Sequence, residues 1–222
     1  PYTEKRILTQ DGTIGLYYSN QIQWSPDGTK LFVCKRKPVE KRYVYYVESS
    51  PADQEQPLLH KQEYAKPGDE LPQHYPTIID VATGNRVEAD RNAIDNQYDL
   101  NWFQWTPDSR AVTMEYNKRS HKLYQMLAMS AETGERKVVV EEKADKFVNY
   151  SSLWRQFVNN GKQLLWTSER DNWNHLYIVD LGTDNANKKG KHATATIRQI
   201  TKGEWCVRGI QYVDEANATI YF

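Results

Sequence analysis

Two stretches of the sequence repeat one another and decide the fold: "IQWSPDGTKLFV" (Ile22–Val33) and "FQWTPDSRAVTM" (Phe103–Met114). Each has an aromatic-bearing run, a Pro-Asp turn and a second apolar run. Proline presets φ for a turn and aspartate hydrogen-bonds its own backbone, so each stretch predicts a β-hairpin. "RQFVNNGKQLLW" (Arg155–Trp166) repeats the pattern with Asn-Asn-Gly as the turn, and "IQYVDEANATIYF" (Ile210–Phe222) repeats it more loosely.

The spacing of these hairpins predicts a repeated unit of about fifty residues. The aromatic residues before the turns, Trp24, Trp105, Phe157 and Tyr212, lie 81, 52 and 55 residues apart. Two of these spacings fit a four-stranded propeller blade, and the first fits a blade with an insertion of about thirty residues. The predicted third strands are Arg42–Ser49, Lys122–Ser130 and His175–Leu181. Fourth strands follow at "NRVEAD", "RKVVVEE" and "IRQITKG", the last after an Asn/Lys/Gly-rich loop at 182–194.

The fold class that follows is all-β: a partial β-propeller of about three to four four-stranded antiparallel blades. The apolar residues alternate with a period of two, and no segment keeps a helical period. We expect one domain, with a blade carrying the insertion at 20–95, blades at 101–142 and 150–203, and the start of another at 205–222. A β-sandwich with Greek-key connections is the alternative.

The insertion is placed at Ser50–Thr77 and contains five prolines. Proline removes a backbone donor, so this stretch is expected to lack a regular ladder. A loop on a rigid scaffold is a place where binding residues collect.

Composition excludes several classes of protein. Twenty-nine basic residues balance 29 acidic ones, so the chain lacks the cationic field that nucleic acid selects. No apolar run approaches the roughly 20 residues that span a bilayer. No cofactor or metal is expected, since His60 and His74, around Glu63, Asp69 and Glu70, lack the spacing of a zinc site. Both ends of the sequence read like the interior of a protein, so we expect a fragment of a longer one.

One stretch, "WTSERDNWNHLYIVDL" (Trp166–Leu181), looks catalytic because Ser168, Asp171 and His175 lie close together. A triad needs side chains that converge beside an oxyanion hole. Three residues within eight positions of a hairpin do not meet that need. We therefore interpret the stretch as a turn between two strands, with Glu169, Arg170 and Asp171 locking the turn and Trp173 and His175 packing between blades.

Longer motifs carry a family resemblance. "WTSERDNWNHLYIVD" (166–180), "QITKGEWCVRGI" (199–210) and "YAKPGDELP" (64–72) resemble the propeller domain of the dipeptidyl peptidase IV branch of the prolyl oligopeptidase family. The resemblance implies an eight-bladed propeller that caps an α/β-hydrolase domain with a Ser-Asp-His triad. It implies a serine-type enzyme that removes dipeptides from peptide amino termini, in the periplasm or outside the cell, and it leaves a homodimer open.

The resemblance also defines what this chain lacks. No GxSxG nucleophile elbow is present, so the hydrolase domain is absent and no catalytic residue is assigned. The family grips the substrate ammonium with adjacent glutamates just before a "WSPDG" strand. Here that segment reads "TQDGTIGLYYSNQIQWSPDG" (Thr9–Gly28) and has no acidic pair.

Three residues remain as candidate contacts to a peptide substrate. Arg42 and Glu48 bracket the Tyr-rich run "RYVYYVE" beside the insertion, where a carboxylate could anchor an amine or form a surface salt bridge. Tyr150 matches, by the resemblance, an aromatic residue near the substrate's second residue, although Ser151 replaces the family's neighbouring arginine. Packing between blades is the other interpretation of Tyr150.

The predicted function is the non-catalytic propeller portion of a serine peptidase. It would gate access and place peptide amino termini for its own C-terminal hydrolase domain. The alternative is a propeller scaffold for protein–protein contacts without peptidase activity, although the Gly-His and Trp-Asp signatures of WD repeats are missing. An isolated arc of blades would expose apolar faces, so we expect such an arc to self-associate.

Overall fold

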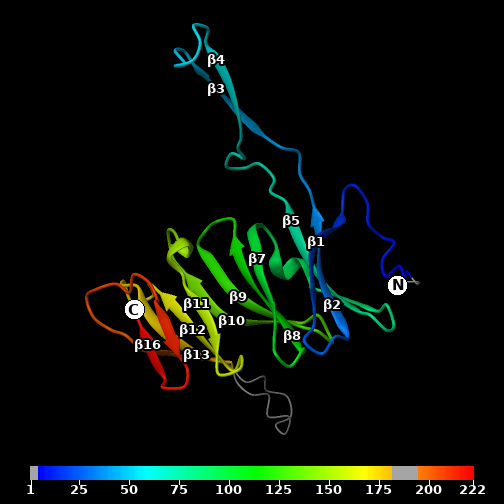
Figure 1. The fold of residues 1–222 in the computed structure, drawn as a ribbon, viewed down its shortest axis with the longest axis vertical. Coiled ribbons are helices and arrows are strands. Elements are labelled where there is room, and N and C mark those ends of the chain that lie inside the picture. The colour runs from blue at the N-terminus through cyan, green and yellow to red at the C-terminus, as the bar shows by residue number, and fades with distance from the viewer. Residues whose placement is uncertain (1–4, 182–194) are drawn as a thin grey trace.

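The computed structural model describes residues 5–181 and 195–222, and within these ranges the fold is a succession of antiparallel sheets (Figure 1). The first sheet contains β1 (Tyr17–Trp24), β2 (Lys30–Lys37), β5 (Gln73–Asp80) and β6 (Arg86–Glu88). The second contains β7 (Gln97–Trp105), β8 (Ala111–Lys118), β9 (Leu123–Ser130) and β10 (Arg136–Lys143). The third contains β11 (Arg155–Val158), β12 (Gln163–Ser168), β13 (His175–Asp180) and β14 (Thr196–Gln199).

Smaller elements complete the described chain. β15 (Tyr212–Asp214) and β16 (Thr219–Tyr221) form a two-stranded sheet, as do β3 (Tyr43–Glu48) and β4 (Leu58–Glu63). Two 3₁₀ turns, η1 (Arg91–Ile94) and η2 (Tyr150–Ser152), precede the second and third sheets. The loop predicted at 182–194 lies outside the described residues. No helix among the described residues is long and apolar enough to cross a membrane.

The repeated hairpin turns form as their residues dictate. In the first, the Ser25 hydroxyl donates to Asp27 Oδ1 at 2.6 Å, and Gly28 takes the positive φ, 70°, that closes the turn. In the second, Thr106 donates to Asp108 at 2.6 Å, and Ser109 takes the positive φ. The Ser109 hydroxyl also accepts from the backbone N–H of Asp27 at 3.0 Å, which joins the turns of the first two sheets.

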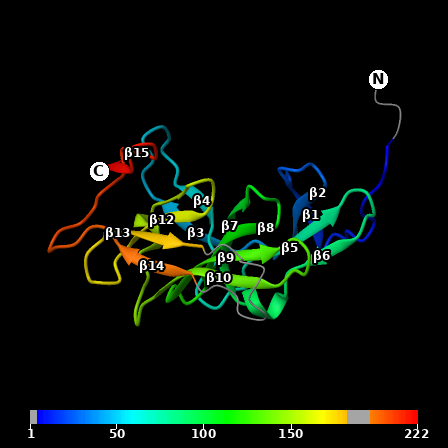
Figure 2. The same cartoon turned by 90° about the horizontal axis from the view of Figure 1, so that it is seen from below.

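Apolar cores fill the spaces between successive sheets. The first core joins Phe32 and Ile78 of the first sheet to Trp105 and Met114 of the second. The second core lies between the second and third sheets and has the fully buried Trp166 in it. A third core joins the third sheet to the β15–β16 pair. Figure 2 shows the sheets following one another from the first to the last.

The opening strands of neighbouring sheets also contact one another. Gln23 of β1 donates to the Phe103 carbonyl of β7 at 3.0 Å, and Trp105 donates back to the Gln23 carbonyl at 3.2 Å. Trp102 of β7 stacks on Phe157 of β11 with ring centroids 5.7 Å apart. Sheets that pack in sequence around their opening strands are propeller blades, so the predicted partial propeller is confirmed and the sandwich alternative is wrong.

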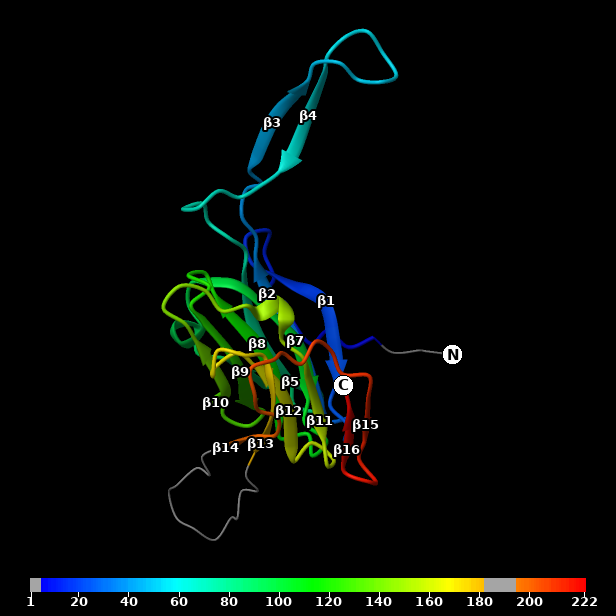
Figure 3. The same ribbon diagram turned by 90° about the vertical axis from the view of Figure 1, so that its left-hand side faces the viewer.

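The strand predicted as the third of the first sheet was wrong. The third strand of the first sheet is β5, which pairs with β2 from Lys30–Asp80 to Lys37–Gln73, and not Arg42–Ser49. Residues Tyr43–Glu48 instead form β3, which pairs with β4 in a hairpin that projects away from the sheets (Figure 3). The prolines of the insertion do not exclude strand pairing. β4 contains no proline, and Pro76 of β5 lies next to the residues of β5 that pair with β6, but outside them.

Candidate functional site

One end of the sheets gathers most residues that sequence analysis singled out. Antiparallel pairing brings the end of β2 beside the start of β5, the end of β8 beside the start of β7, and the end of β12 beside the start of β13. The projecting hairpin and η2 both lie at this end, which we call the insertion end (Figure 1).

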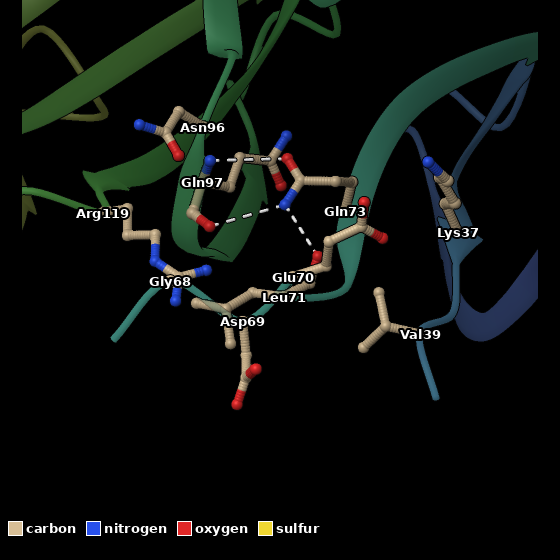
Figure 4. Close-up of a pocket in the computed structure, with 10 residues that line it drawn as sticks. All are labelled: Lys37, Val39, Gly68, Asp69, Glu70, Leu71, Gln73, Asn96, Gln97 and Arg119. Carbon is tan, nitrogen blue, oxygen red and sulfur yellow. Dashed lines mark hydrogen bonds between the residues drawn. The ribbon is translucent and has the colours of Figure 1, made fainter. Parts of the chain in front are cut away.

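A pocket of about 520 Å³ lies at the base of the insertion (Figure 4). Gln73 and Gln97 line the pocket. The side-chain amide of Gln97 forms hydrogen bonds with the backbone of His74 (2.9 Å) and of Ile94 (3.0 Å). Arg119 donates to the Lys66 carbonyl at 3.3 Å, which ties the returning loop to the second sheet. The remaining lining residues are Lys37, Val39, Gly68, Asp69, Glu70, Leu71 and Asn96.

The candidates Arg42 and Glu48 lie on the projecting hairpin and do not meet. Glu48 is 2.7 Å from His60 Nε2 across the β3–β4 pair, and Tyr46 stacks on the same imidazole at 4.8 Å. Arg42 lies 3.8 Å from Glu40, with its side chain 60% exposed. Each residue has a nearby surface partner, and neither is brought to Tyr150.

Tyr150 lies at the centre of an aromatic cluster at the insertion end. Its ring is stacked nearly parallel to that of the buried Tyr124, 5.9 Å away. It also contacts the rings of Tyr98 at 6.2 Å, His121 at 5.7 Å and Phe147 at 5.7 Å. Burial, and then the neighbouring Tyr98 hydroxyl, raise the pKa of Tyr150. Tyr150 therefore both packs against the core and contributes to a partly exposed aromatic surface.

Below this cluster, a buried ion pair joins the second and third sheets. Arg155 at the start of β11 contacts both oxygens of Glu115 on β8, at 2.5 and 2.6 Å. Tyr124 donates a third contact to Glu115 at 2.5 Å. Burial raises the pKa of Glu115, while the Tyr124 hydroxyl and the Arg155 charge oppose that rise.

Trp102 borders this ion pair in an unusual backbone conformation. Its φ is 52°, at the point where the β7–β8 register shifts, so the strand carries a bulge there. A bulge re-aims a side chain, and here it places the indole beneath the Arg155 guanidinium, 5.0 Å from the ring centroid. A bulky residue rarely adopts positive φ, so the surrounding contacts stabilise this conformation.

The stretch at 166–181 contains the end of β12, a turn and β13, so it joins two strands as sequence analysis interpreted it. Ser168 donates to Glu142 of β10 at 2.8 Å, and the two ring nitrogens of His175 lie within 3.0 Å of Thr201 and the Gly203 carbonyl. Asp171 bonds Gln199. These partners differ for each residue, so the three form no relay. Arg170 holds the turn to Glu142 through an ion pair, as expected. His175 packs edge-on against Trp205, whereas Trp173, which was also expected to pack between blades, is 39% exposed.

Sequence analysis did not find Glu115 or Arg155. Polar residues on apolar strands were the available signal, as in "MEYN" (Met114–Asn117). That signal cannot show which partners meet across sheets. Among the described residues, no three His, Cys, Asp or Glu side chains gather as metal ligands would.

Comparisons with known proteins agree with this geometry. Residues 16–222 match the family model described as the dipeptidyl peptidase IV (DPP IV) N-terminal region. Porphyromonas gingivalis dipeptidyl peptidase 4 is similar in structure, with a TM-score of 0.64 and 20% identity over 96% of this chain and 30% of that one. A candidate dipeptidyl aminopeptidase IV from Bacteroides ovatus gives 0.60 and 22% over 93% and 31%. The chain thus spans about a third of the length of these proteins. The match over almost its whole length shows that the chain belongs to the dipeptidyl peptidase IV N-terminal region family.

Proposed function

We propose that this chain is the non-catalytic propeller portion of a serine-type dipeptidyl peptidase. Its role is to restrict access to the active site and to place peptide amino termini for an α/β-hydrolase domain that follows it in the longer protein. The observation that carries the proposal is the family match over residues 16–222. The aromatic surface around Tyr150 at the insertion end supports the positioning role, since aromatic rings bind apolar peptide side chains well.

The test uses the full-length protein that contains this chain. It is assayed on chromogenic X-Pro peptides with a free or an acetylated amino terminus, with and without a serine-directed covalent inhibitor. Cleavage of the free peptides alone, abolished by the inhibitor, is the expected result. Equal cleavage of both peptides contradicts the dipeptidyl version, and activity that survives the inhibitor contradicts the serine-type version. Export to the periplasm or the medium belongs to the same proposal and is tested by cell fractionation.

The projecting hairpin supports a homodimer as part of this proposal. Val47 and Leu59 are cross-strand partners that are 62% and 64% exposed, and Tyr45 beside them is 60% exposed. Exposed apolar residues gathered on one face are typical of a protein–protein contact. The hairpin is therefore proposed to contact a second copy of the protein.

Sedimentation of the full-length protein tests this contact. The double variant Val47→Glu with Leu59→Lys removes the apolar pair but keeps opposite charges across the hairpin, so the strands stay paired. We expect a dimer that becomes a monomer, while Gln62→Ser on the other face of the hairpin leaves the dimer intact. A wild-type monomer, or a dimer that is unaffected by the double variant, contradicts the contact.

A further inference from the structure

The insertion makes little apolar contact with the rest of the protein. We call residues 38–72 the arm: it contains the β3–β4 hairpin and the two segments that connect the hairpin to β2 and β5. None of these residues is buried, and none belongs to the three apolar cores of the described chain. Segments with few buried apolar contacts move most readily. The orientation of the arm therefore depends on how the two connecting segments are attached to the sheets.

Two short tethers attach the arm. The pairing of β2 with β5 ends at Lys37 and Gln73. The pairing of the hairpin begins where the Tyr64 N–H donates to the Arg42 carbonyl at 2.9 Å. Between these points the chain runs as two tethers, 38–41 and 65–72, which join the hairpin to the sheets (Figure 3). Hinge motions take place at such loop segments, where a few residues absorb the change in φ and ψ.

The returning tether forms a compact turn that is bound to the second sheet by a long hydrogen bond. Gly68 takes a positive φ of 97°, and the Asp69 N–H donates to the Lys66 carbonyl at 3.0 Å. The same carbonyl accepts from Arg119, which follows β8, at 3.3 Å. This distance is longer than that of a typical N–H···O hydrogen bond, so the contact is weak. Exchanging it for another contact costs little.

Two unpaired charges of opposite sign line the pocket at the base of the arm. The pocket has a volume of about 520 Å³, and Lys37, Glu70 and Arg119 are part of its lining. Figure 4 shows Lys37 and Arg119 on opposite sides of the pocket, with Glu70 on the loop between them. Lys37 and Glu70 are both exposed, and neither forms an ion pair with another described residue. The pocket gives the returning tether room to bring these two charges together.

We propose that the arm is hinged at the two tethers and that the pocket closes when Glu70 forms an ion pair with Lys37. The structure shows the open form. In the closed form, the returning tether moves toward the end of β2, and the Lys37–Glu70 ion pair replaces the hydrogen bond from Arg119 to Lys66. An exposed ion pair and one long hydrogen bond each stabilise weakly, so the two forms lie close in free energy and both are populated.

The motion changes the direction in which the arm presents its apolar face. Tyr45, Val47 and Leu59 lie together on one face of the hairpin, and the hairpin moves with the returning tether. A partner that binds one form better shifts the population toward that form. The inference goes beyond the proposed function, because the motion does not depend on whether the protein cleaves peptides.

The experiment is double electron–electron resonance on the full-length protein. Spin labels are attached at Ser50→Cys, in the hairpin loop, and at Glu132→Cys, in the exposed β9–β10 turn, after the other exposed cysteines, Cys206 among them, are replaced with serine. Labelled protein is diluted with unlabelled protein, so that the distances measured lie within one chain. Two distance populations are expected, and about 1 M salt should reduce the closed one because it screens the ion pair.

A change of charge identifies the contact. Glu70→Lys places two positive charges across the pocket and should reduce the closed population roughly twofold or more. The exchanged pair, Lys37→Glu with Glu70→Lys, should restore it. Glu55→Lys is the matched control, because it makes the same change of charge in the exposed hairpin loop and should leave both populations unchanged.

A single distance that neither salt nor Glu70→Lys changes overturns the inference. Equal effects of Glu70→Lys and Glu55→Lys, or no recovery in the exchanged pair, overturn closure through the Lys37–Glu70 contact. Peptide cleavage is not measured here, so none of these results bears on the proposed function.

Discussion

Glu142 on β10 accepts hydrogen bonds from Trp166 and Ser168 of β12, both at 2.8 Å, and from Arg170 in the turn after β12 at 2.5 Å. It is 6% exposed, so these contacts lie in a region of low dielectric. A single carboxylate thus joins two blades. Ser168, one of the three residues that looked catalytic, therefore contributes to this contact between blades.

Glu142→Ala is expected to destabilise the protein by about 3–5 kcal/mol, because it leaves a partly buried arginine and two buried donors without their acceptor. The free energy of unfolding is measured by urea titration followed by tryptophan fluorescence. Glu135→Ala, in the exposed turn before β10, is the control and should change stability by less than about 0.5 kcal/mol. Equal effects of both variants would contradict the inter-blade role.

The Asp27 carboxylate makes the stabilising contribution of the first hairpin turn depend on pH. The Ser25 hydroxyl, followed by the Thr29 backbone and hydroxyl, lowers the pKa of Asp27 from 3.8 to about 2. The folded-state pKa is below the unfolded one, so the ionised carboxylate stabilises the fold above about pH 4. That contribution is lost as the pH falls from about 4 through about 2.

Asp27→Asn therefore should destabilise the protein most above pH 4, and its difference from wild type should shrink toward pH 2. Urea midpoints between pH 2 and 6 for both proteins measure this. Asp53→Asn in the exposed loop of the insertion serves as the control. A difference that is constant across the range would show that the charge of Asp27 does not stabilise the turn.

At the scale of elements, the β9–β10 turn fits tightly against the first sheet. Gly134 has a φ of 76°, and a Cβ added there would lie 2.5 Å from the Glu88 carbonyl oxygen and 3.0 Å from Val87 Cγ1. Gly28, in the first hairpin turn, has a similar φ of 70° but open space around it. Substituting alanine at each glycine therefore separates the cost of backbone strain from the cost of a steric clash between blades.

Gly28→Ala should cost about 1–2 kcal/mol, the penalty of the left-handed conformation alone. Gly134→Ala should cost more, since a backbone carbonyl of the neighbouring sheet must also move. Thermal melting of the two variants measures the comparison. A larger loss of stability in Gly28→Ala would contradict the tight packing of the first two sheets.

At the scale of the whole molecule, the outermost sheets carry exposed apolar side chains. Ile22 and Trp24 on β1 are 60% and 58% exposed, and Tyr212 and Phe222 near the other end of the arc are 61% and 55% exposed. Blades within the arc bury such residues against the next sheet. Contiguous exposed apolar surface favours association.

We therefore expect residues 1–222, produced alone, to self-associate through these outer faces. Light scattering with increasing protein concentration measures the association. The paired variant Trp24→Gln with Ile22→Thr should reduce it, whereas Tyr45→Gln on the projecting hairpin should not reduce it to the same degree. A monodisperse monomer at high concentration would show that the outer faces need no partner.

The sequence by itself determined the repeat, the hairpin turns and most strands, because these depend on neighbouring residues: Pro-Asp and Asn-Asn-Gly set local φ values, and period-two alternation specifies a pleated strand. The tertiary structure alone decided that β5 replaces Arg42–Ser49 as the third strand of the first sheet. The run Arg42–Ser49 has the aromatic and β-branched residues of a strand, whereas β5 contains Pro76 and lacks a period-two alternation; only pairing with β2 separates Ile78, buried in the core, from the exposed Tyr45. The same holds for Glu115, Tyr124 and Arg155: cross-strand register and the packing of successive sheets bring these residues together, and neither depends on residues that are adjacent in the chain.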